Sequence, residues 1–215
     1  MIGIGLTTRN RSETARNTYN KIMELGPHGW FKLAVVDDAS DLPFEGSTYR
    51  FEQNAGVGSA KNKCLELLEG CEHMFLFDDD CSPVVDEWWL PYINSGLNHA
   101  AYTFDRMELN RTSKYVSYEY PNGCMLYFTR KCIDTAGGWD TEFQGYGWDH
   151  CELSRRIYNM GLTPAQFVDI PNSAVLFQMA DCESSFSYET RAATIPINAE
   201  LYQQKYFSKE FKPYK

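Results

Sequence analysis

Four short apolar segments, separated by helix-like segments, limit the folds open to this sequence more than any other feature. They span residues 1–8, 31–36, 49–51 and 73–77. Capping residues at 10–13 begin one intervening helix, which Gly26 and Pro27 end. The glycine-containing stretch 54–58 begins another. Because strands that are apolar throughout and alternate with helices favour a covered parallel sheet, we predict an α/β fold with a mainly parallel central sheet flanked by helices.

Polar side chains stand at the carboxyl ends of three of the four apolar segments. They are Thr7-Thr8-Arg9, Asp37-Asp38 and Asp78-Asp79-Asp80. The carboxyl ends of parallel strands meet at one edge of a sheet, and ligands bind at that edge. We therefore expect these side chains to share one site.

The acidic triplet 78–80 carries the strongest chemical signal among them. Adjacent carboxylates repel one another unless a cation or hydrogen-bond donors relieve them. Mn²⁺ and Mg²⁺ prefer oxygen ligands and also bind phosphates, so a metal-bound diphosphate is one interpretation. A solvated acidic turn is the other, and the triplet alone does not separate the two.

Two neighbouring loops carry weaker signals. Residues 37–40 are typical of a capped turn, but one of their carboxylates can also accept a hydrogen bond from a nucleobase imide. Thr7 and Arg9 can contact the base and the phosphates. Residues 54–63 begin a helix whose first amides can face phosphate. They lack the third glycine of a dinucleotide-binding loop, where Lys61 stands, so a plain helix start is the favoured interpretation.

The stretch 137–153 is the most informative part of the sequence. It contains Trp139, Tyr146 and Trp148 in a glycine-rich loop, and Asp149, His150 and Glu152 at the start of a helix. The glycines let the backbone pass close to a ligand, and the aromatic rings provide flat apolar faces for sugars. We interpret the stretch as an acceptor-binding floor with a general base. Alternatively, the acids only stabilise the helix dipole.

Composition narrows the classes of function. The chain has 215 residues, of which 43% are hydrophobic, enough for one core. A net charge of −9 disfavours a general nucleic-acid or membrane-surface binder, although lysines and aromatics in 202–215 keep anionic acceptors open. Seven cysteines without a CxxC pair, and a start without a leader, favour reduced thiols in the cytoplasm. No apolar run is long enough for a transmembrane segment.

Five motifs together resemble the inverting family 2 glycosyltransferases and their relatives of the GT-A (Rossmann-like) fold. They are Thr-Thr-Arg-Asn-Arg at 7–11, Val-Val-Asp-Asp-Ala-Ser at 35–40, the helix start at 54–62, a DxD metal motif at 77–80, and the stretch 137–153. The last is similar to Gly-Gly-Trp-Asp and Gly-Trp-Gly-x-Glu-Asp segments of β-1,4-galactosyltransferases, bacterial chondroitin polymerases and polypeptide N-acetylgalactosaminyltransferases. The motifs cover residues 1–170 in the family's order.

The resemblance implies a role for each matching residue. The expected donor contacts are Thr7, Arg9 and Asp38 with the uracil or its ribose, Asp78 with the ribose or the metal, and Asp80 with the metal, Mn²⁺ or Mg²⁺. Further nucleotide-sugar contacts are expected from Asn54, Lys61, Asp79, Gly147 and Trp148. Acceptor contacts are expected from Trp139, Tyr146 and Glu152.

The sequence departs from its relatives at two places. The Glu-Asp pair that supplies their catalytic base aligns with Asp149-His150, so either residue is a candidate base. Asn holds this place in the retaining N-acetylgalactosaminyltransferases, which leaves inversion open. Many relatives also bind the metal through a late histidine. The matching residues 175–179 have none, so Gln178, Asp181 or water would complete the shell.

These observations predict a metal-dependent transferase that moves a sugar from a nucleotide-sugar, most simply a UDP-sugar, to an acceptor hydroxyl. The acceptor is a glycan, a lipid-linked sugar, a protein or a modified nucleobase. We expect one GT-A domain at 1–195, with a nucleotide-sugar half at 1–100 and an acceptor half at 101–195, and a basic-aromatic tail at 196–215. The alternatives are a non-catalytic nucleotide- or sugar-binding descendant and a metal-dependent phosphohydrolase, whose acidic motif normally follows the first strand.

Overall fold

A six-stranded sheet forms the centre of the protein. The computed structural model describes residues 1–27, 29–180 and 186–215. The first half contains β1 (Ile2–Thr8), α1 (Ser12–Leu25), β2 (Phe31–Asp37), β3 (Tyr49–Arg50), α2 (Val57–Leu67), β4 (His73–Asp78), β5 (Cys81–Pro83), α3 (Leu90–Asn94) and β6 (His99–Ala101). The second contains β7 (Glu108–Arg111), β8 (Val116–Tyr118), β9 (Met125–Thr129), α4 (Arg130–Ala136), α5 (Asp149–Asn159), β10 (Val168–Asp169), a short 3₁₀ helix (Ser173–Val175), β11 (Phe177–Met179) and α6 (Tyr188–Gln204).

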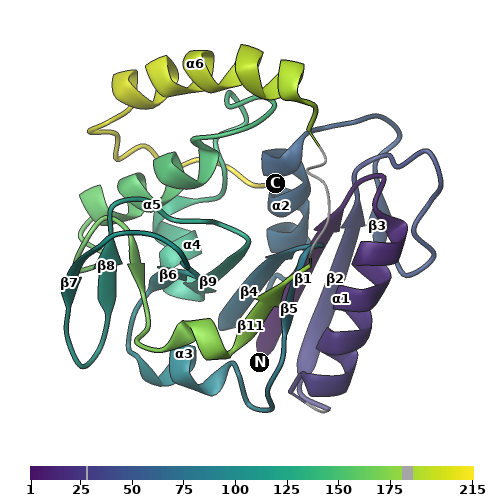
Figure 1. Ribbon diagram of the computed structural model, residues 1–215, viewed down its shortest axis with the longest axis horizontal. Helices are drawn as coiled ribbons and strands as arrows, with labels where there is room; N and C mark the ends of the chain where they lie inside the picture. The colour runs from purple at the N-terminus through teal and green to yellow at the C-terminus, as the bar shows by residue number, and fades with distance from the viewer. Residues whose placement is uncertain (28, 181–185) are drawn as a thin grey trace.

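The strand order is β3-β2-β1-β4-β9-β6 (Figure 1). β1 pairs in parallel with β2 and β4, and β2 pairs in parallel with β3. β9 is antiparallel to both of its neighbours, β4 and β6, so it alone runs against the other five strands. The predicted mainly parallel sheet is confirmed, and the carboxyl ends of β1, β2 and β4 lie side by side.

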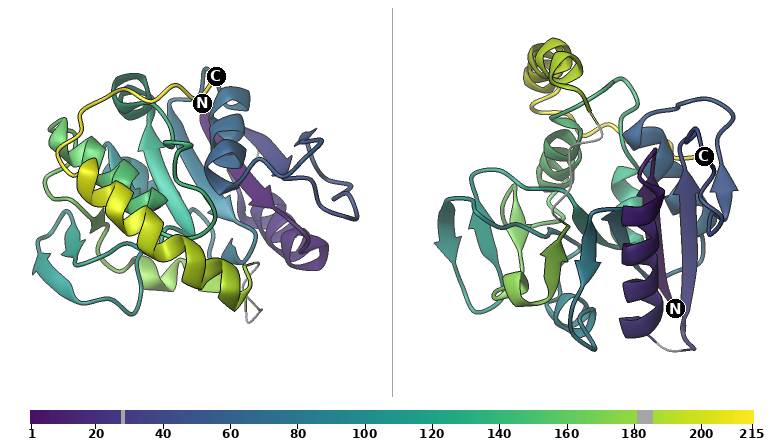
Figure 2. Two further views of the ribbon diagram at one scale, coloured as in Figure 1. Left: turned by 90° about the horizontal axis from the view of Figure 1, so that it is seen from above. Right: turned by 45° about the vertical axis from the view of Figure 1, so that its right-hand side comes forward.

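Helices cover both faces of the sheet (Figure 2). On one face, Ile4 and Phe75 join a core with Ile22 of α1 and Tyr92 of α3. On the other face, Val36 of β2 and Met74 of β4 share a core with three helix residues, which are Leu65 of α2, Ile133 of α4 and Leu153 of α5. Because both faces are buried, the strands show continuous apolar runs rather than alternation.

The segment between β5 and β6 contains only a short helix. α3 spans residues 90–94, although residues 86–98 together have a helix-like pattern. Glu87 has a φ of 57°, outside the right-handed helical region, and Trp88 turns into the core against Phe75 and Phe77. Burial of the Trp88 ring therefore outweighs local helix propensity here.

The basic-aromatic tail is part of the folded chain. α6 runs through position 196, where we placed the start of the tail, and lies across the top of the molecule in Figure 1. Beyond it, the backbone amide of Gly138 donates to the carbonyl of Lys212 at 2.8 Å. Lys205 and Lys212 contact Asp140 at 2.5 and 3.1 Å. Lys205 and Lys212 are thus neutralised within the chain.

A buried ion pair fixes the start of the glycine-rich loop. Arg156 contacts both carboxylate oxygens of Glu152, at 2.7 and 3.1 Å, one helical turn earlier on α5. The same guanidinium donates to the carbonyls of Ala136 and Gly138. Both side chains are almost fully buried, so this pair joins α5 to the chain that leads into the loop.

We expect Arg156→Met to lower the free energy of unfolding by about 3–5 kcal/mol, because it leaves a buried carboxylate without its partner. Urea unfolding measures this loss. Arg16→Met is the control, since Arg16 pairs with Glu45 at the surface at 3.5 Å and should change stability by less than about 1 kcal/mol. Equal losses in the two variants would contradict this role. Combining Arg156→Met with Glu152→Leu should recover part of the loss.

Candidate active site at the carboxyl edge of the sheet

The middle carboxylate of the acidic triplet points into the protein. Asp79 is 6% exposed. The hydroxyl of Thr8 donates to its Oδ2 at 2.7 Å, and Arg11 contacts its Oδ1 at 2.6 Å. Burial raises the pKa of Asp79 to about 7, although the Arg11 guanidinium acts in the opposite direction. Asp79 thus ties β4 to β1, and its nucleotide contact stays a prediction.

The outer carboxylates each face a cation. Lys61 Nζ lies 2.6 Å from Asp78 Oδ1, and Arg11 lies 2.7 Å from Asp80 Oδ2. The Lys61 side chain is fully buried, and its ammonium lies 5.6 Å from the centre of the Trp139 ring. Burial alone would lower the pKa of Lys61, but the Asp78 carboxylate outweighs it and the pKa is raised. The triplet is therefore relieved by two charged side chains of the chain itself.

The remaining donor-side candidates surround this cluster. Asp38 accepts hydrogen bonds from the amides of Ala55 and Gly56 at 2.7 and 3.0 Å, so it shapes the loop that begins α2. Asn54 Oδ1 accepts from the same Gly56 amide at 3.2 Å. The side chain of Thr7 is buried beside β4, and Arg9 is exposed just beyond the end of β1. The structure thus brings the predicted donor residues to one edge.

His150 lies under the acidic edge, at the start of α5. Its side chain is 17% exposed, and its Nδ1 accepts a hydrogen bond from Trp139 Nε1 at 3.2 Å. Asp149 Oδ2 lies 3.6 Å from the same Nδ1. Burial lowers the pKa of His150 and nearby Lys61 lowers it further, while Asp149 raises it. A neutral ring whose Nδ1 accepts must carry its proton on Nε2.

Two positioning residues escaped the sequence analysis. A Cβ on Gly123 would lie 2.2 Å from His150 Cδ2, so only glycine lets this loop pack on the imidazole. Asn62 holds Trp139 through both its backbone groups, donating to the carbonyl at 3.0 Å and accepting from the amide at 2.8 Å. Neither contact has a sequence signal, because each joins segments far apart in the chain. Arg11 stands in a quoted motif but was given no role.

The predicted acceptor residues divide into two groups. Trp139 is 1% exposed and Glu152 is 2% exposed, so both support the loop from inside the protein, and their acceptor contacts stay predictions. Tyr146, by contrast, is 42% exposed. Trp148 caps α5 with a left-handed φ of 72°, and its ring packs against Tyr202 at 5.0 Å between centroids. Tyr146 is therefore the exposed aromatic of the loop, while Gly147 and Trp148 are half-buried.

Helix α6 holds this part of the loop in place. The Asn198 amide donates to the carbonyls of Gln144 and Gly147 at 2.9 and 3.0 Å. The amide of Tyr146 donates to the Thr194 hydroxyl at 3.1 Å. Residues 144–148 are thus anchored to a helix that lies about fifty positions later in the chain.

The late segment expected to complete a metal shell lies beside the acidic triplet. β11 pairs with β5 so that Met179 faces Cys81, and the amide of Ala180 donates to the carbonyl of Asp80 at 2.7 Å. Gln178 is exposed, and Asp181 lies outside the described residues. Within the described ranges, no group of three or more His, Cys, Asp or Glu side chains is arranged to hold a metal ion.

Comparison with known proteins places this geometry in context. No protein-family model matches the chain. It is 28% identical over 137 residues to an uncharacterized glycosyltransferase, R363, of Acanthamoeba polyphaga mimivirus, covering 57% of this chain and 53% of the relative. The chain thus spans about half the length of this relative.

Solved glycosyltransferase structures share the fold. GalNAc-T7 with UDP, GalNAc and Mn²⁺ matches 95% of this chain and 48% of its own with a TM-score of 0.71 and 11% identity. The match with a mannosyltransferase from Pyrobaculum calidifontis in complex with GDP-Man and Mn²⁺ covers 99% of this chain and 66% of the mannosyltransferase, with a TM-score of 0.71 and 17% identity. The match with a Drosophila β-1,4-galactosyltransferase 7 mutant complex covers 88% of this chain and 79% of that protein, with a TM-score of 0.55 and 16% identity. The expected GT-A fold is confirmed.

No helix in the described part of the chain is both long and apolar enough to cross a membrane.

We expect Trp139→Phe to raise the pKa of His150 by roughly half a unit to one unit, because the variant loses a hydrogen bond to the neutral ring. NMR titration of the imidazole measures the shift. Trp30→Phe is the control, since Trp30 is exposed and should leave that pKa unchanged. An unchanged titration in Trp139→Phe would show that this hydrogen bond does not hold the ring neutral.

The raised pKa of Asp79 predicts a pH dependence of stability. An aspartate titrates near 3.8 in an unfolded chain, but Asp79 titrates at about 7 in the fold. Between these values only the folded protein keeps the proton, so this contribution to stability is complete below about pH 4 and is lost as pH rises through about 7. Urea unfolding at about pH 5 and about pH 8 should show a smaller decline for Asp79→Asn than for the wild type. Equal declines would argue against the assigned pKa.

Proposed function

We propose that this chain, which has the GT-A fold, transfers a sugar from a nucleotide-sugar to an acceptor hydroxyl. The observation that carries the proposal is that Lys61 and Asp78, at the same sheet edge as Asp38 and Asp80, lie within electrostatic reach of Asp149-His150. A donor-binding edge that adjoins a base candidate is what group transfer between two bound molecules requires. The UDP and GDP-Man in the complexes of the structural neighbours support this class of donor.

The donor binds at the ends of β1, β2 and β4. Thr7, Arg9 and Asp38 receive the base and ribose, and a UDP-sugar is our proposed donor. Asn54 and the first amides of α2 face the phosphates, where a helix start favours negative charge. Lys61 lies close enough to Asp78 to move between that carboxylate and a phosphate oxygen, so it offsets charge that develops on the leaving diphosphate.

Asp78 and Asp80 are the residues that would hold Mn²⁺ or Mg²⁺. Two carboxylates fit a cation that takes most of its other ligands from substrate phosphates and water. When bound, such a cation supplies charge neutralisation for the departing diphosphate. Since Lys61 and Arg11 already contact the two carboxylates, metal binding without a nucleotide should be weak. Gln178 is a further ligand candidate from the adjacent strand.

Asp149 is the proposed base, and His150 the proposed hydrogen-bond donor. Nδ1 of His150 already accepts from Trp139, and its Nε2 carries the proton, so the neutral ring has no open position to take another. The Asp149 carboxylate beside it can accept the proton of an acceptor hydroxyl as that oxygen attacks the sugar. Nε2–H of His150 can bind a phosphate or acceptor oxygen. Attack from the face opposite the diphosphate inverts the sugar carbon.

One observation favours a second function, a binding protein without catalysis. The ion pairs of Asp78 and Asp80 leave those carboxylates neutralised without any metal. Nucleotide binding with neither sugar transfer nor slow hydrolysis of the donor would support that function. The phosphohydrolase alternative loses support, because the acids follow β4 while β1 ends in two threonines.

We also propose an acceptor class and a location in the cell. A glycan, lipid-linked sugar, protein or modified nucleobase acceptor is compatible with the exposed Tyr146 and the half-buried Trp148. Cys64, Cys71, Cys81, Cys124, Cys132 and Cys151 are free thiols. That chemistry supports a cytoplasmic location, where thiols stay reduced.

Calorimetric titration with UDP tests the donor and metal assignments together. We expect Mn²⁺ to strengthen UDP binding to the wild type by roughly tenfold or more, and Asp80→Asn to lose most of that gain. Asp86→Asn removes an exposed acid with the same change of charge and should keep the gain. An intact Mn²⁺ response in Asp80→Asn would refute the metal site. UDP release from a UDP-sugar in the presence of acceptors then separates transfer from binding alone.

A further inference from the structure

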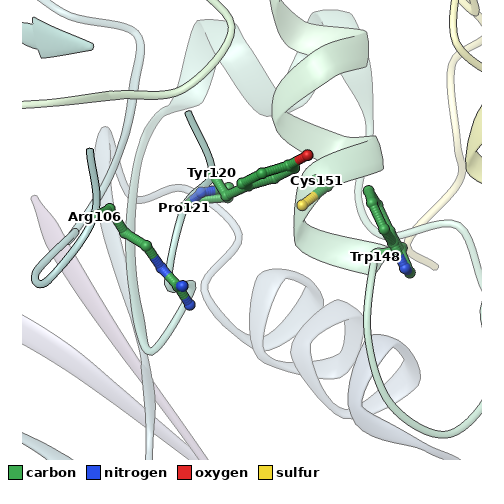
Figure 3. A pocket seen from close by; sticks show the side chains of 5 residues that line it. All are labelled: Arg106, Tyr120, Pro121, Trp148 and Cys151. Carbon is green, nitrogen blue, oxygen red and sulfur yellow. The ribbon is translucent and has the colours of Figure 1, made fainter. Parts of the chain in front are cut away.

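A shallow depression of about 320 Å³ opens beside the start of α5. Its walls are Arg106, Tyr120, Pro121, Trp148 and Cys151 (Figure 3). Asp149, the proposed base, lies between Trp148 and Cys151 in the sequence and on the first turn of the same helix. The depression is therefore adjacent to the position where an acceptor hydroxyl would lose its proton. Its only member with a predicted role is Trp148.

Arg106 brings an unused positive charge to this depression. Its side chain is exposed and forms no ion pair with any other described residue. Other arginines of the acceptor half have partners, since Arg111 pairs with Glu108 and Arg155 stacks on the ring of Tyr206 at 3.7 Å. Burial raises the pKa of the Cys151 thiol to about 12, with Asp149 raising it and Arg106 lowering it, so both charges lie near that sulfur.

Two hydrogen bonds hold Arg106 opposite Tyr120. The amide of Phe104 donates to Asn122 Oδ1 at 3.0 Å, and the amide of Glu119 donates to the carbonyl of Met107 at 3.1 Å. Arg106 lies between Phe104 and Met107 in the sequence, and Tyr120 lies between Glu119 and Asn122. The two loops are therefore joined on both sides of the depression, which limits the entropy lost on binding.

The opposite wall is a strained tryptophan. Trp148 has a φ of 72°, a conformation that is uncommon for a bulky residue and is often retained at functional sites. Tyr202 packs on its ring at 5.0 Å, and Tyr120 meets it nearly edge-on at 6.1 Å. Figure 3 shows Tyr120 between Arg106 and Trp148. Aromatic surface on one side and a guanidinium on the other suit a ring that carries an anionic substituent.

We propose that this depression binds an acceptor saccharide with one anionic group, a carboxylate or a phosphate. Arg106 binds the anionic group, and Tyr120 and Trp148 contact the sugar ring. The inference rests on the proposed function, because it places the acceptor beside Asp149.

The charge around the depression limits the ligand to a single anionic group. The acids Asp105 and Glu119 are sequence neighbours of Arg106 and Tyr120, and both are exposed. The chain as a whole carries a net charge of −9. One compact anion can pair with the guanidinium, whereas a polyanion such as nucleic acid would also meet these carboxylates.

Ligand-observed NMR titrations test the proposal on the full chain with three probes. They are methyl β-glucuronide for the carboxylate, glucose 6-phosphate for the phosphate, and methyl β-glucoside as the neutral reference. We expect the wild type to bind at least one anionic probe roughly tenfold more tightly than the neutral one. Arg106→Gln should abolish the preference, and Arg106→Lys should keep part of it. Lys114→Gln, which removes an exposed charge elsewhere in the acceptor half, should leave it intact.

The outcomes separate this proposal from the proposed function. Equal binding of anionic and neutral probes by the wild type, or an unchanged preference in Arg106→Gln, would overturn it. So would tighter, Arg106-dependent binding of a single-stranded oligonucleotide. UDP binding, measured on the same samples, reports on the donor site alone. A wild type that binds UDP but shows no anion preference would contradict only this inference, and a wild type that shows the preference but does not bind UDP would contradict only the proposed function.

Discussion

The buried ion pair between Lys61 and Asp78 is the interaction on which the rest of the site depends. Lys61 belongs to α2 and Asp78 ends β4, so the pair sets the distance between the helix and the edge of the sheet. The ammonium also lies against the ring of Trp139, whose indole in turn orients His150. A fully buried lysine needs a strong partner, because desolvation of an unpaired ammonium costs several kcal/mol. The carboxylate therefore fixes both halves of the site.

The sheet and its polar edge can be predicted from the sequence because both depend on residues that are close together in the chain. Continuous apolar runs such as 73–77 are dictated by burial on two faces, and the residue after each run must lie at the edge. Asp79 was harder to place, because its carboxylate turns inward toward Thr8 and Arg11. Three adjacent acids look alike in sequence and differ only in the partners that folding supplies.

The inward turn of Trp139 and Glu152 also depends on partners distant in the chain. Asn62, on α2, holds Trp139 in the loop between α4 and α5, and no spacing in the sequence connects them. Glu152 and Arg156 do stand at the four-residue spacing of a helical ion pair, which is a readable signal. That spacing normally describes a solvated surface. Its burial here follows from the carbonyls of Ala136 and Gly138, which Arg156 also binds.

The contact of Lys212 with the loop has a consequence for how the protein is made. The segment that leads to Trp139 is held by the backbone of Lys212 and by charges at Lys205, some sixty-five to seventy-five positions later. During synthesis the sheet and α2 can assemble before Lys205 and Lys212 are present to hold that segment. Ordering of the loop must therefore wait until residues 205–212 have emerged, so a ribosome paused in α6 would display a formed acidic edge beside a glycine-rich loop that is not yet held in place.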